Sequence, residues 1–277
     1  MVDEQTGVTS RIIDYLKVGD RMSIPSFSLE NRVAVVSGAR RGIGKAIALA
    51  FAEAGSHVAV CDCVVEGGEL DAVASSIQRL GRRSFAAKVD VSQKVEVDHF
   101  VEKVEHELGA IDIMVNDASI HSNPSLLETS EDEWRHVIDV NLTGYYLCCQ
   151  AVGKKMVERK SGSIINIASV AGIHWGWGGW GAYNVAKAGV IMLTKHLARE
   201  MGGRNVRVNA IAPSVIKTEM TSRLWEMPEA LATEQSKIPL GRLGEVGDLT
   251  GAAIFLASEA SAYITGHTLI VDGGRLA

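Results

Sequence analysis

Short apolar runs rich in β-branched residues alternate along this chain with segments of helical periodicity. The runs lie at 32–37, 57–61, 84–88, 111–116, 163–168, 206–212 and 269–271. The helical patterns between them lie at 43–54, 68–80, 94–108, 131–159, 183–201 and 246–257. Strands that alternate with helices form a parallel sheet with helices on both faces. The sequence therefore predicts an α/β fold with one such sheet, in a single domain.

Length and charge restrict what this domain can do. The chain has 277 residues, of which 47% are hydrophobic and 22% charged, and its net charge is -5. An acidic balance without clustered basic residues argues against a nucleic-acid partner. No apolar run approaches the ~20 residues that span a bilayer, and the polar start Met1–Gln5 lacks the layout of a secretory signal. We therefore predict a cytoplasmic protein with no membrane partner.

Two stretches interrupt the alternation of strands and helices. Residues 1–30 precede the first strand as an N-terminal extension, and Ile12, Ile13 and Leu16 within them could form one amphipathic turn. This extension is either a tail or an arm that packs on a neighbouring subunit. Within the domain at 31–277, the segment 213–240 is longer than an ordinary loop, so it is interpreted as a substrate lid.

The four cysteines do not suggest a metal site. They occur as Cys61 with Cys63 and as the adjacent pair Cys148 and Cys149. This spacing differs from that of zinc sites. Reduced thiols and no bound metal are therefore expected.

A glycine-rich turn follows the first strand directly. It contains Gly38, Gly42 and Gly44, and the next helix begins beside Ile43. Glycines at such a turn let backbone N–H groups approach a pyrophosphate at the helix N-terminus. The turn predicts a dinucleotide site, and its alternative reading is a tight connection without a ligand.

Acidic and amide side chains end the next strands. Asp62 ends the second strand, where the dinucleotide fingerprint expects an acid that binds the adenosine ribose. A carboxylate there repels a 2′-phosphate, so NAD is favoured over NADP; Arg40 and Arg41 are the residues that would favour NADP. Other candidate contacts at strand ends are Asp90, Val91 and Asn116.

A proton-transfer group is predicted from Tyr183 and Lys187. These residues stand at i and i+4, so they share one face of a helix, and Ser169 precedes them. A lysine ammonium favours the phenolate and should lower the pKa of Tyr183. A tyrosine of lowered pKa exchanges a proton with an alcohol oxygen, which the Ser169 hydroxyl would hold.

In this order of motifs the chain resembles the short-chain dehydrogenase/reductase family. The similarity extends from about Leu29 to Gly274 and is highly specific. It depends on the residues Gly38, Gly42, Ile43, Gly44, Asp62, Asp90, Val91, Asn116, Asp117, Ala118, Ser119, Asn141, Ser169, Tyr183, Lys187, Pro213, Ile216 and Thr218. The resemblance implies a Rossmann-type, doubly wound sheet of seven parallel strands, a nicotinamide cofactor and a homotetramer.

The resemblance also assigns roles to individual residues. Tyr183 would be the acid/base, Ser169 would bind the substrate oxygen, and Lys187 would hold the nicotinamide ribose. Asn141 is similar to an asparagine that holds a water in the proton relay. Contacts on the nicotinamide side would come from Ile216 and Thr218, and those on the adenosine side from Asp90, Val91, Asn116 and Ala118.

The chain departs from the family pattern in two segments: the family's Asn-Asn-Ala-Gly is Asn116-Asp117-Ala118-Ser119 here, and its Pro-Gly is Pro213-Ser214. Ser119 replaces a glycine whose backbone lies near the cofactor, and Ser214 replaces the glycine of a Pro-Gly pair. Neither departure changes a proton-transfer residue.

The loop between Ser169 and Tyr183 contains Trp175, Trp177 and Trp180. Tryptophans in this position can form the wall of a substrate pocket or pack against a neighbouring subunit or the lid. We expect at least one of them to line the pocket.

These features predict an NAD(P)-dependent enzyme that interconverts a secondary alcohol and a ketone on a small-molecule substrate. One alternative is an NADPH-dependent reductase of 3-oxoacyl thioesters or other carbonyls. A second alternative, a dinucleotide sensor without catalysis, predicts the loss of Tyr183, Lys187 or Ser169, and all three are present. A lyase or epimerase on this scaffold would usually carry a longer C-terminal domain.

Overall fold

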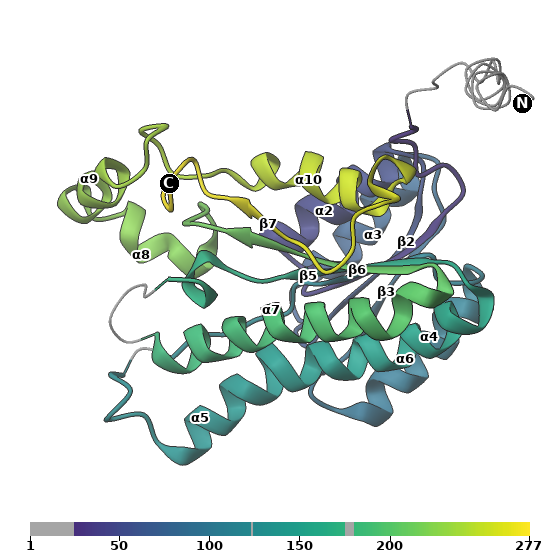
Figure 1. The fold of residues 1–277 in the computed structure, drawn as a ribbon, viewed down its shortest axis with the longest axis horizontal. Coiled ribbons are helices and arrows are strands. Elements are labelled where there is room, and N and C mark those ends of the chain that lie inside the picture. The colour runs from purple at the N-terminus through teal and green to yellow at the C-terminus, as the bar shows by residue number, and fades with distance from the viewer. Residues whose placement is uncertain (1–24, 123, 175–179) are drawn as a thin grey trace, which may run out of the picture.

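The computed structural model describes residues 25–122, 124–174 and 180–277. These residues form one sheet between two layers of helices (Figure 1). The strands are β1 (Val33–Ser37), β2 (His57–Asp62), β3 (Ser84–Lys88), β4 (Ile113–Asn116), β5 (Gly162–Ile167), β6 (Val206–Pro213) and β7 (Thr268–Val271). All six pairings between neighbouring strands are parallel. The predicted doubly wound, seven-stranded Rossmann-type sheet is confirmed.

The strand order places a switch in direction at the centre of the sheet. The order is β3-β2-β1-β4-β5-β6-β7, so the chain builds outward from β1 to β3 and then returns to build from β4 to β7. In open α/β sheets, ligands bind at the carboxyl ends of the strands beside such a switch. The fold therefore positions a site between the ends of β1 and β4.

Each face of the sheet packs against its own helices. On one face lie α2 (Gly42–Glu53), α3 (Glu69–Arg79) and α10 (Thr250–Ala257), and on the other lie α4 (Lys94–Glu107), α6 (Gly144–Arg159) and α7 (Gly181–Met201) (Figure 1). The side chains of β1 alternate between these layers. Ala34 and Val36 join the α2 layer, whereas Val33 and Val35 join the α6 layer. A strand buried on both faces is apolar throughout, as this run is.

The predicted helix at 131–159 is interrupted in the structure. It consists of α5 (Glu131–Ile138), one π-helical turn at Asp139–Thr143, and α6. A π turn inserts a residue into the helix and is frequent at functional sites. Asn141 lies in this turn and is completely buried.

The predicted lid at 213–240 contains short helices. These are a 3₁₀ turn at Glu219–Thr221, α8 (Ser222–Trp225) and α9 (Pro228–Ser236). The helix α9 is joined to the end of the chain by Glu234, whose side chain is 4% exposed. The Glu234 carboxylate pairs with Arg275 at 2.7 Å and also with Lys237. This segment therefore packs on the C-terminal residues, as Figure 1 shows.

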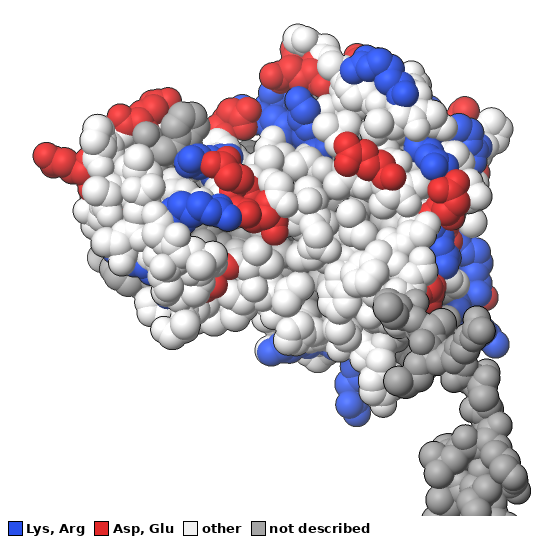
Figure 2. All heavy atoms as spheres, turned by 90° about the horizontal axis from the view of Figure 1, so that it is seen from above, with Lys and Arg blue, Asp and Glu red and all other residues white. Residues whose placement is uncertain are grey.

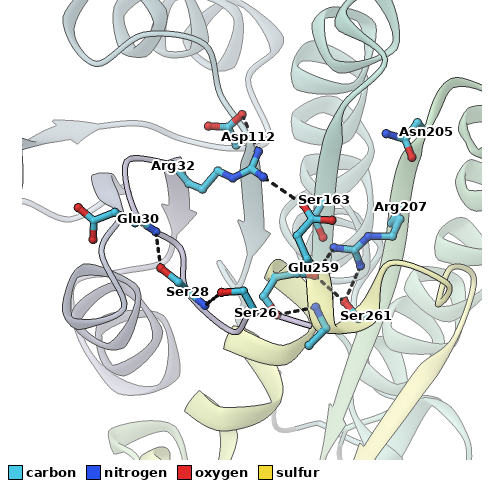
Figure 3. Close-up of polar contacts among 12 residues, drawn as sticks. Ser26, Ser28, Glu30, Arg32, Asp112, Ser163, Asn205, Arg207, Glu259 and Ser261 are labelled. Carbon is cyan, nitrogen blue, oxygen red and sulfur yellow. Dashed lines mark hydrogen bonds and ion pairs between the residues drawn. The ribbon is translucent and has the colours of Figure 1, made fainter. Parts of the chain in front are cut away.

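Ion pairs join the segments at the amino ends of the strands (Figure 3). Arg32 pairs with Glu259 at 3.0 Å and with Asp112 at 3.7 Å, and Arg207 donates to Ser261 at 2.7 Å. These contacts connect the starts of β1, β4 and β6 to the segment after α10. They lie at the end of the sheet opposite the glycine turn, so the site is built on strands that are held at their far ends.

Residues 1–24 of the predicted N-terminal extension lie outside the described residues. Leu29 is completely buried in the α2 layer, and its N–H donates to the Ala54 carbonyl at 2.9 Å. Packing onto the domain therefore includes Leu29, shortly before β1.

The buried side chain of Phe51, between α2 and the sheet, should contribute measurably to the free energy of unfolding. Phe51 is 0% exposed in this layer, so Phe51→Ala should lower the free energy of unfolding by about 3–5 kcal/mol, because it removes apolar contacts and leaves a cavity. Urea unfolding followed by circular dichroism measures this loss. Tyr263 is an aromatic residue that is fully exposed, and Tyr263→Ala should leave the urea midpoint unchanged. Equal losses in the two variants would contradict the assignment of Phe51 to the core.

Candidate active site

A cavity of about 400 Å³ opens at the carboxyl ends of the central strands. Its wall contains most of the residues that the sequence singles out. These are Gly38, Arg41, Gly42, Ile43, Asp62, Asp90, Val91, Ala118, Ser169, Tyr183, Lys187, Ile216 and Thr218. The glycine turn, the proton-transfer residues and the start of the lid therefore meet at one site.

The glycine turn packs directly against the segment that follows β4. A Cβ atom on Gly38 would lie 2.7 Å from the backbone of Ala118, and Gly38 has a φ of +66°. A Cβ atom on Gly44 would lie 2.6 Å from the Gly38 carbonyl oxygen and 2.8 Å from Asp117 Oδ2. These two positions therefore require glycine.

The N-terminus of α2 suits an anionic ligand. The helix begins at Gly42 beside the cavity, and its N-cap residue, Arg41, provides no side-chain hydrogen bond to the first turn. No acidic residue lies in that turn. The Asp117 carboxylate already accepts a hydrogen bond from the Gly44 N–H, and the remaining N–H groups and the helix dipole favour a phosphate at this position. The residues present thus fit the pyrophosphate of a dinucleotide.

Asp62 lies at the end of β2, in the cavity wall. Its Oδ1 accepts from the Val64 N–H at 3.0 Å and lies 3.9 Å from Arg40 Nε. Arg40 also pairs with Glu69. The guanidinium beside Asp62 is therefore shared between two carboxylates, whereas Arg41 is exposed.

The residues at the ends of β3 and β4 differ in where their side chains lie. Asp90 lines the cavity and accepts from the N–H and hydroxyl of Ser92 at 2.9 and 2.7 Å. The Asn116 side chain, by contrast, is not part of the cavity wall. It donates to Asn166 Oδ1 at 2.8 Å and contacts Cys149, so it joins β4 to β5. The Asn116 amide is thus used inside the sheet, and a cofactor contact at Asn116 stays a prediction.

Asn141 holds the loop that follows β4. Its Nδ2 donates to the Ile120 carbonyl at 2.7 Å, and its Oδ1 accepts from the Ile120 N–H at 2.9 Å. Ile120 lines the cavity, whereas Asn141 does not. The structure therefore shows Asn141 as a support of the cavity wall, and its role toward a water stays a prediction from the resemblance.

Tyr183 and Lys187 lie one turn apart on α7, as their spacing predicts. The Lys187 Nζ is 5.5 Å from the centroid of the Tyr183 ring. Ser169 begins the turn Val170–Gly172, and its hydroxyl accepts from the Ala171 N–H at 3.1 Å and forms a hydrogen bond with Tyr183. A Cβ on Gly172 would lie 2.6 Å from the Lys187 backbone, so this turn sits directly on α7. The serine is thereby positioned beside the phenol.

The predicted lowering of the Tyr183 pKa is wrong. Burial raises the pKa of Tyr183 to about 12, and the Asp117 carboxylate acts in the same direction. The hydrogen bond with Ser169 opposes both effects and favours the phenolate. Desolvation therefore outweighs the attraction that the spacing with Lys187 suggested.

Two residues beside Lys187 were missed by the sequence analysis as functional groups. Lys187 is 1% exposed and donates to the Tyr145 hydroxyl at 3.0 Å and to the Ile167 carbonyl at 2.7 Å. Asp117 lines the same cavity, and its charge favours the ammonium, although burial still lowers the pKa of Lys187. One available signal was that Tyr145 follows Asn141 at i+4. The other was that Asp117 replaces an amide of the family pattern.

Aromatic side chains form the wall beyond Tyr183. Trp180 lines the cavity, meets the Tyr183 ring edge-on at 5.2 Å and stacks on His121 at 4.6 Å. Trp175 and Trp177 lie outside the described residues. The prediction that a tryptophan of this loop lines the pocket is confirmed for Trp180.

The four cysteines all lie within the described residues. All four cysteines are free, and Cys63 is exposed whereas the other three are buried. Within the described ranges, no cluster of His, Cys, Asp and Glu is placed to bind a metal ion. None of the helices described here combines the length and apolarity needed to cross a bilayer.

Comparison with known proteins identifies the family. The sequence model described as "Enoyl-(Acyl carrier protein) reductase" matches residues 38–275. The 3-oxoacyl-[acyl-carrier-protein] reductase FabG of Thermotoga maritima is 40% identical over 246 residues, which is 89% of this chain and 98% of that protein. The chain is a short-chain dehydrogenase/reductase. It is thus an NAD(P)-dependent oxidoreductase that acts on CH–OH or carbonyl groups.

Other members of this family are about equally similar. The D-threitol dehydrogenase of Mycolicibacterium smegmatis is 41% identical over 253 residues, which is 90% of this chain and 94% of that protein. The crystal structure of a gluconate 5-dehydrogenase from Burkholderia cenocepacia, in complex with NADP and tartrate, has a TM-score of 0.86 at 34% identity. It covers 91% of this chain and 98% of its own. The family is therefore shown, while its members named here differ in substrate.

The contact between Gly44, Gly38 and Asp117 can be tested with one methyl group. Gly44→Ala should weaken NADH and NADPH binding and destabilise the fold by about 1–3 kcal/mol, because the new Cβ overlaps a carbonyl oxygen. Ligand fluorescence and thermal unfolding measure the two effects. Gly251→Ala is the matched control, because a Cβ there meets no atom within 4 Å. Normal binding by Gly44→Ala would show that the turn does not hold the dinucleotide.

Proposed function

We propose that this short-chain dehydrogenase/reductase interconverts a secondary alcohol and a ketone on a small, hydroxylated substrate. The observation that carries this proposal is the placement of Ser169, Tyr183 and Lys187 in one cavity with the glycine turn. The hydroxyls of Ser169 and Tyr183 are already hydrogen-bonded to each other, so one substrate oxygen can contact both. Such a pair binds an oxygen atom and exchanges its proton.

Each of the three residues has a distinct part in the reaction. Ser169 orients the substrate oxygen, and Tyr183 accepts the hydroxyl proton in oxidation or donates it in reduction. Lys187 holds its ammonium below the Tyr183 ring and favours the phenolate. A bound nicotinamide dinucleotide supplies the hydride acceptor or donor.

For the cofactor, the side chains and the relatives support different dinucleotides. Asp62 supports NAD, because its carboxylate lies at the strand end where the ribose hydroxyls bind, and its nearest cation, Arg40, is already paired with Glu69. The Burkholderia cenocepacia structure contains NADP, which supports NADP instead. We propose NAD as the cofactor because of Asp62. The comparisons with relatives favour NADP instead.

The surface charges support a small substrate over a carrier protein. The basic residues Lys217, Arg242 and Arg275, on or after the lid, each pair with a carboxylate within 2.6–2.8 Å. On the face seen in Figure 2, acidic side chains lie beside the basic ones. An acidic carrier protein would be attracted by basic residues that have no acidic neighbour. Ion pairs at these three basic residues reduce the attraction.

The second candidate function is reduction of a 3-oxoacyl thioester. The curated relatives support it more directly than the small alcohol, because proteins such as the FabG of Thermotoga maritima bear that name. The chemistry at Tyr183 and Ser169 is the same for both candidates. NADH and NADPH absorbance assays with D-threitol, gluconate and a 3-oxobutyryl thioester distinguish them. Turnover of the thioester alone would favour the second candidate.

The homotetramer and the cytoplasmic location stay proposals based on the resemblance and the sequence. Exposed apolar side chains on α6 and α7 support the first of these, namely Tyr146, Val185 and Met192. Such side chains are candidates for burial between subunits.

Loss of the Tyr183 hydroxyl tests the assigned acid/base. Tyr183→Phe should lower kcat by about 10²–10⁴-fold, because general acid–base catalysis is lost, and leave the Kd for NADH within about threefold. Steady-state rates and fluorescence titration measure these values. Tyr263→Phe, at a fully exposed tyrosine, is the control. Substantial turnover by Tyr183→Phe would refute the role.

Removal of the Asp62 carboxylate tests the cofactor preference. Asp62→Ala should raise the ratio of NADP to NAD efficiency by about tenfold or more, because a charge that repels the 2′-phosphate is lost. The ratio of kcat/KM values measures this change, and Asp71→Ala on the exposed face of α3 is the control. Tighter binding of NADPH than NADH by the unmodified protein would contradict the preference for NAD.

A further inference from the structure

Tyr145 is a buried tyrosine that the family motifs do not include. It lies on α6, one turn after Asn141, and its side chain is 1% exposed. Its hydroxyl donates to the Ile167 carbonyl at 3.1 Å and accepts from Lys187 Nζ at 3.0 Å. Lys187 itself donates to the same carbonyl at 2.7 Å. The three polar atoms therefore form a closed triangle at the end of β5.

We propose that Tyr145 is a positioning residue that holds the Lys187 ammonium in its charged form beneath Tyr183. This inference rests on the proposed function for the consequence in catalysis, but the contact itself does not depend on it. Tyr145 does not line the cavity, so it acts through Lys187.

The hydrogen-bonding capacity of an ammonium explains why this contact matters. Lys187 has three N–H donors and no acceptor. Two of the donors are directed at Tyr145 and Ile167, which leaves one for the cavity that Lys187 lines. A buried ammonium without acceptors would lose its proton or move toward solvent. The Tyr145 hydroxyl thus fixes both the place and the charge of Nζ.

The orientation of the Tyr145 hydroxyl is determined by its second partner. Because its hydrogen is donated to the Ile167 carbonyl, its lone pairs are available to Lys187. The ring contributes as well, since Nζ lies 4.8 Å from its centroid. A phenylalanine would keep the ring contact and lose the acceptor.

The other titratable groups around this triangle are few. Asp117 follows β4, Tyr183 lies on α7, and Cys148 and Cys149 lie on α6. Burial raises the pKa of the Asp117 carboxyl to about 7, and the charge of its ionised form favours the ammonium. Burial raises the pKa of both thiols, so they stay neutral and do not replace the Tyr145 hydroxyl.

The adjacent Tyr146 provides a matched control. Its side chain is 43% exposed, and its hydroxyl accepts from Gln150 Nε2 at 2.6 Å on the outer face of α6. Tyr145→Phe and Tyr146→Phe therefore remove the same hydroxyl from neighbouring positions of one helix. Only the first touches Lys187.

The direct test is titration of Lys187 in the full-length protein labelled with ¹³C at lysine Cε, with the resonance assigned by Lys187→Met. In Tyr145→Phe the midpoint for Lys187 should fall by about half a pH unit or more, because the ammonium loses an acceptor. In Tyr146→Phe it should equal that of the unmodified protein. An unchanged midpoint in Tyr145→Phe overturns the proposal.

The consequence for catalysis is read from a pH profile. For alcohol oxidation, the rising limb of kcat against pH should move to higher pH in Tyr145→Phe, because the weaker ammonium favours the Tyr183 phenolate less. A loss of kcat with an unshifted profile would indicate packing alone and overturn the role in positioning. If the titration shifts as expected but the unmodified protein oxidises no secondary alcohol, the proposed function fails and the contact with Lys187 stands.

Discussion

The site depends on keeping one almost fully buried ammonium charged. Burial lowers the pKa of Lys187, so the fold has to supply partners for it. The partners come from three separate elements: the Ile167 carbonyl at the end of β5, the Tyr145 hydroxyl on α6, and the charge of Asp117 after β4. The parallel sheet brings these elements together because the carboxyl ends of its central strands lie side by side.

The arrangement of elements was largely predictable from the sequence, because a strand buried on both faces has to be apolar throughout and a covering helix has to be periodic. The run at Val33–Val36 illustrates the first condition. The π turn at Asp139–Thr143 was not predictable, since an inserted residue leaves the surrounding pattern nearly helical. The helices α8 and α9 were also missed, because α8 has only four residues and α9 packs on the end of the chain with little periodic signal of its own.

Some features of the candidate site were likewise predictable from local sequence, whereas others depend on contacts between segments far apart in the chain. The face shared by Tyr183 and Lys187 follows from helical spacing, and the glycine turn follows from its place between a strand and a helix. The inward side chain of Asn116 and the contact between Tyr145 and Lys187 depend on elements far apart in the chain. The high pKa of Tyr183 was missed for a different reason, because desolvation depends on tertiary burial rather than on sequence spacing.

The buried carboxylate of Glu234 links α9 to residues near the end of the chain that line the cavity. One of its oxygens binds Arg275 near the chain's end, while Arg275 and Leu276 themselves form part of the cavity wall. Trimming the chain before Arg275 would remove one ion-pair partner of Glu234, whose carboxylate also pairs with Lys237. Loss of the final residues would therefore remove part of the cavity wall together with a contact that holds α9 in place.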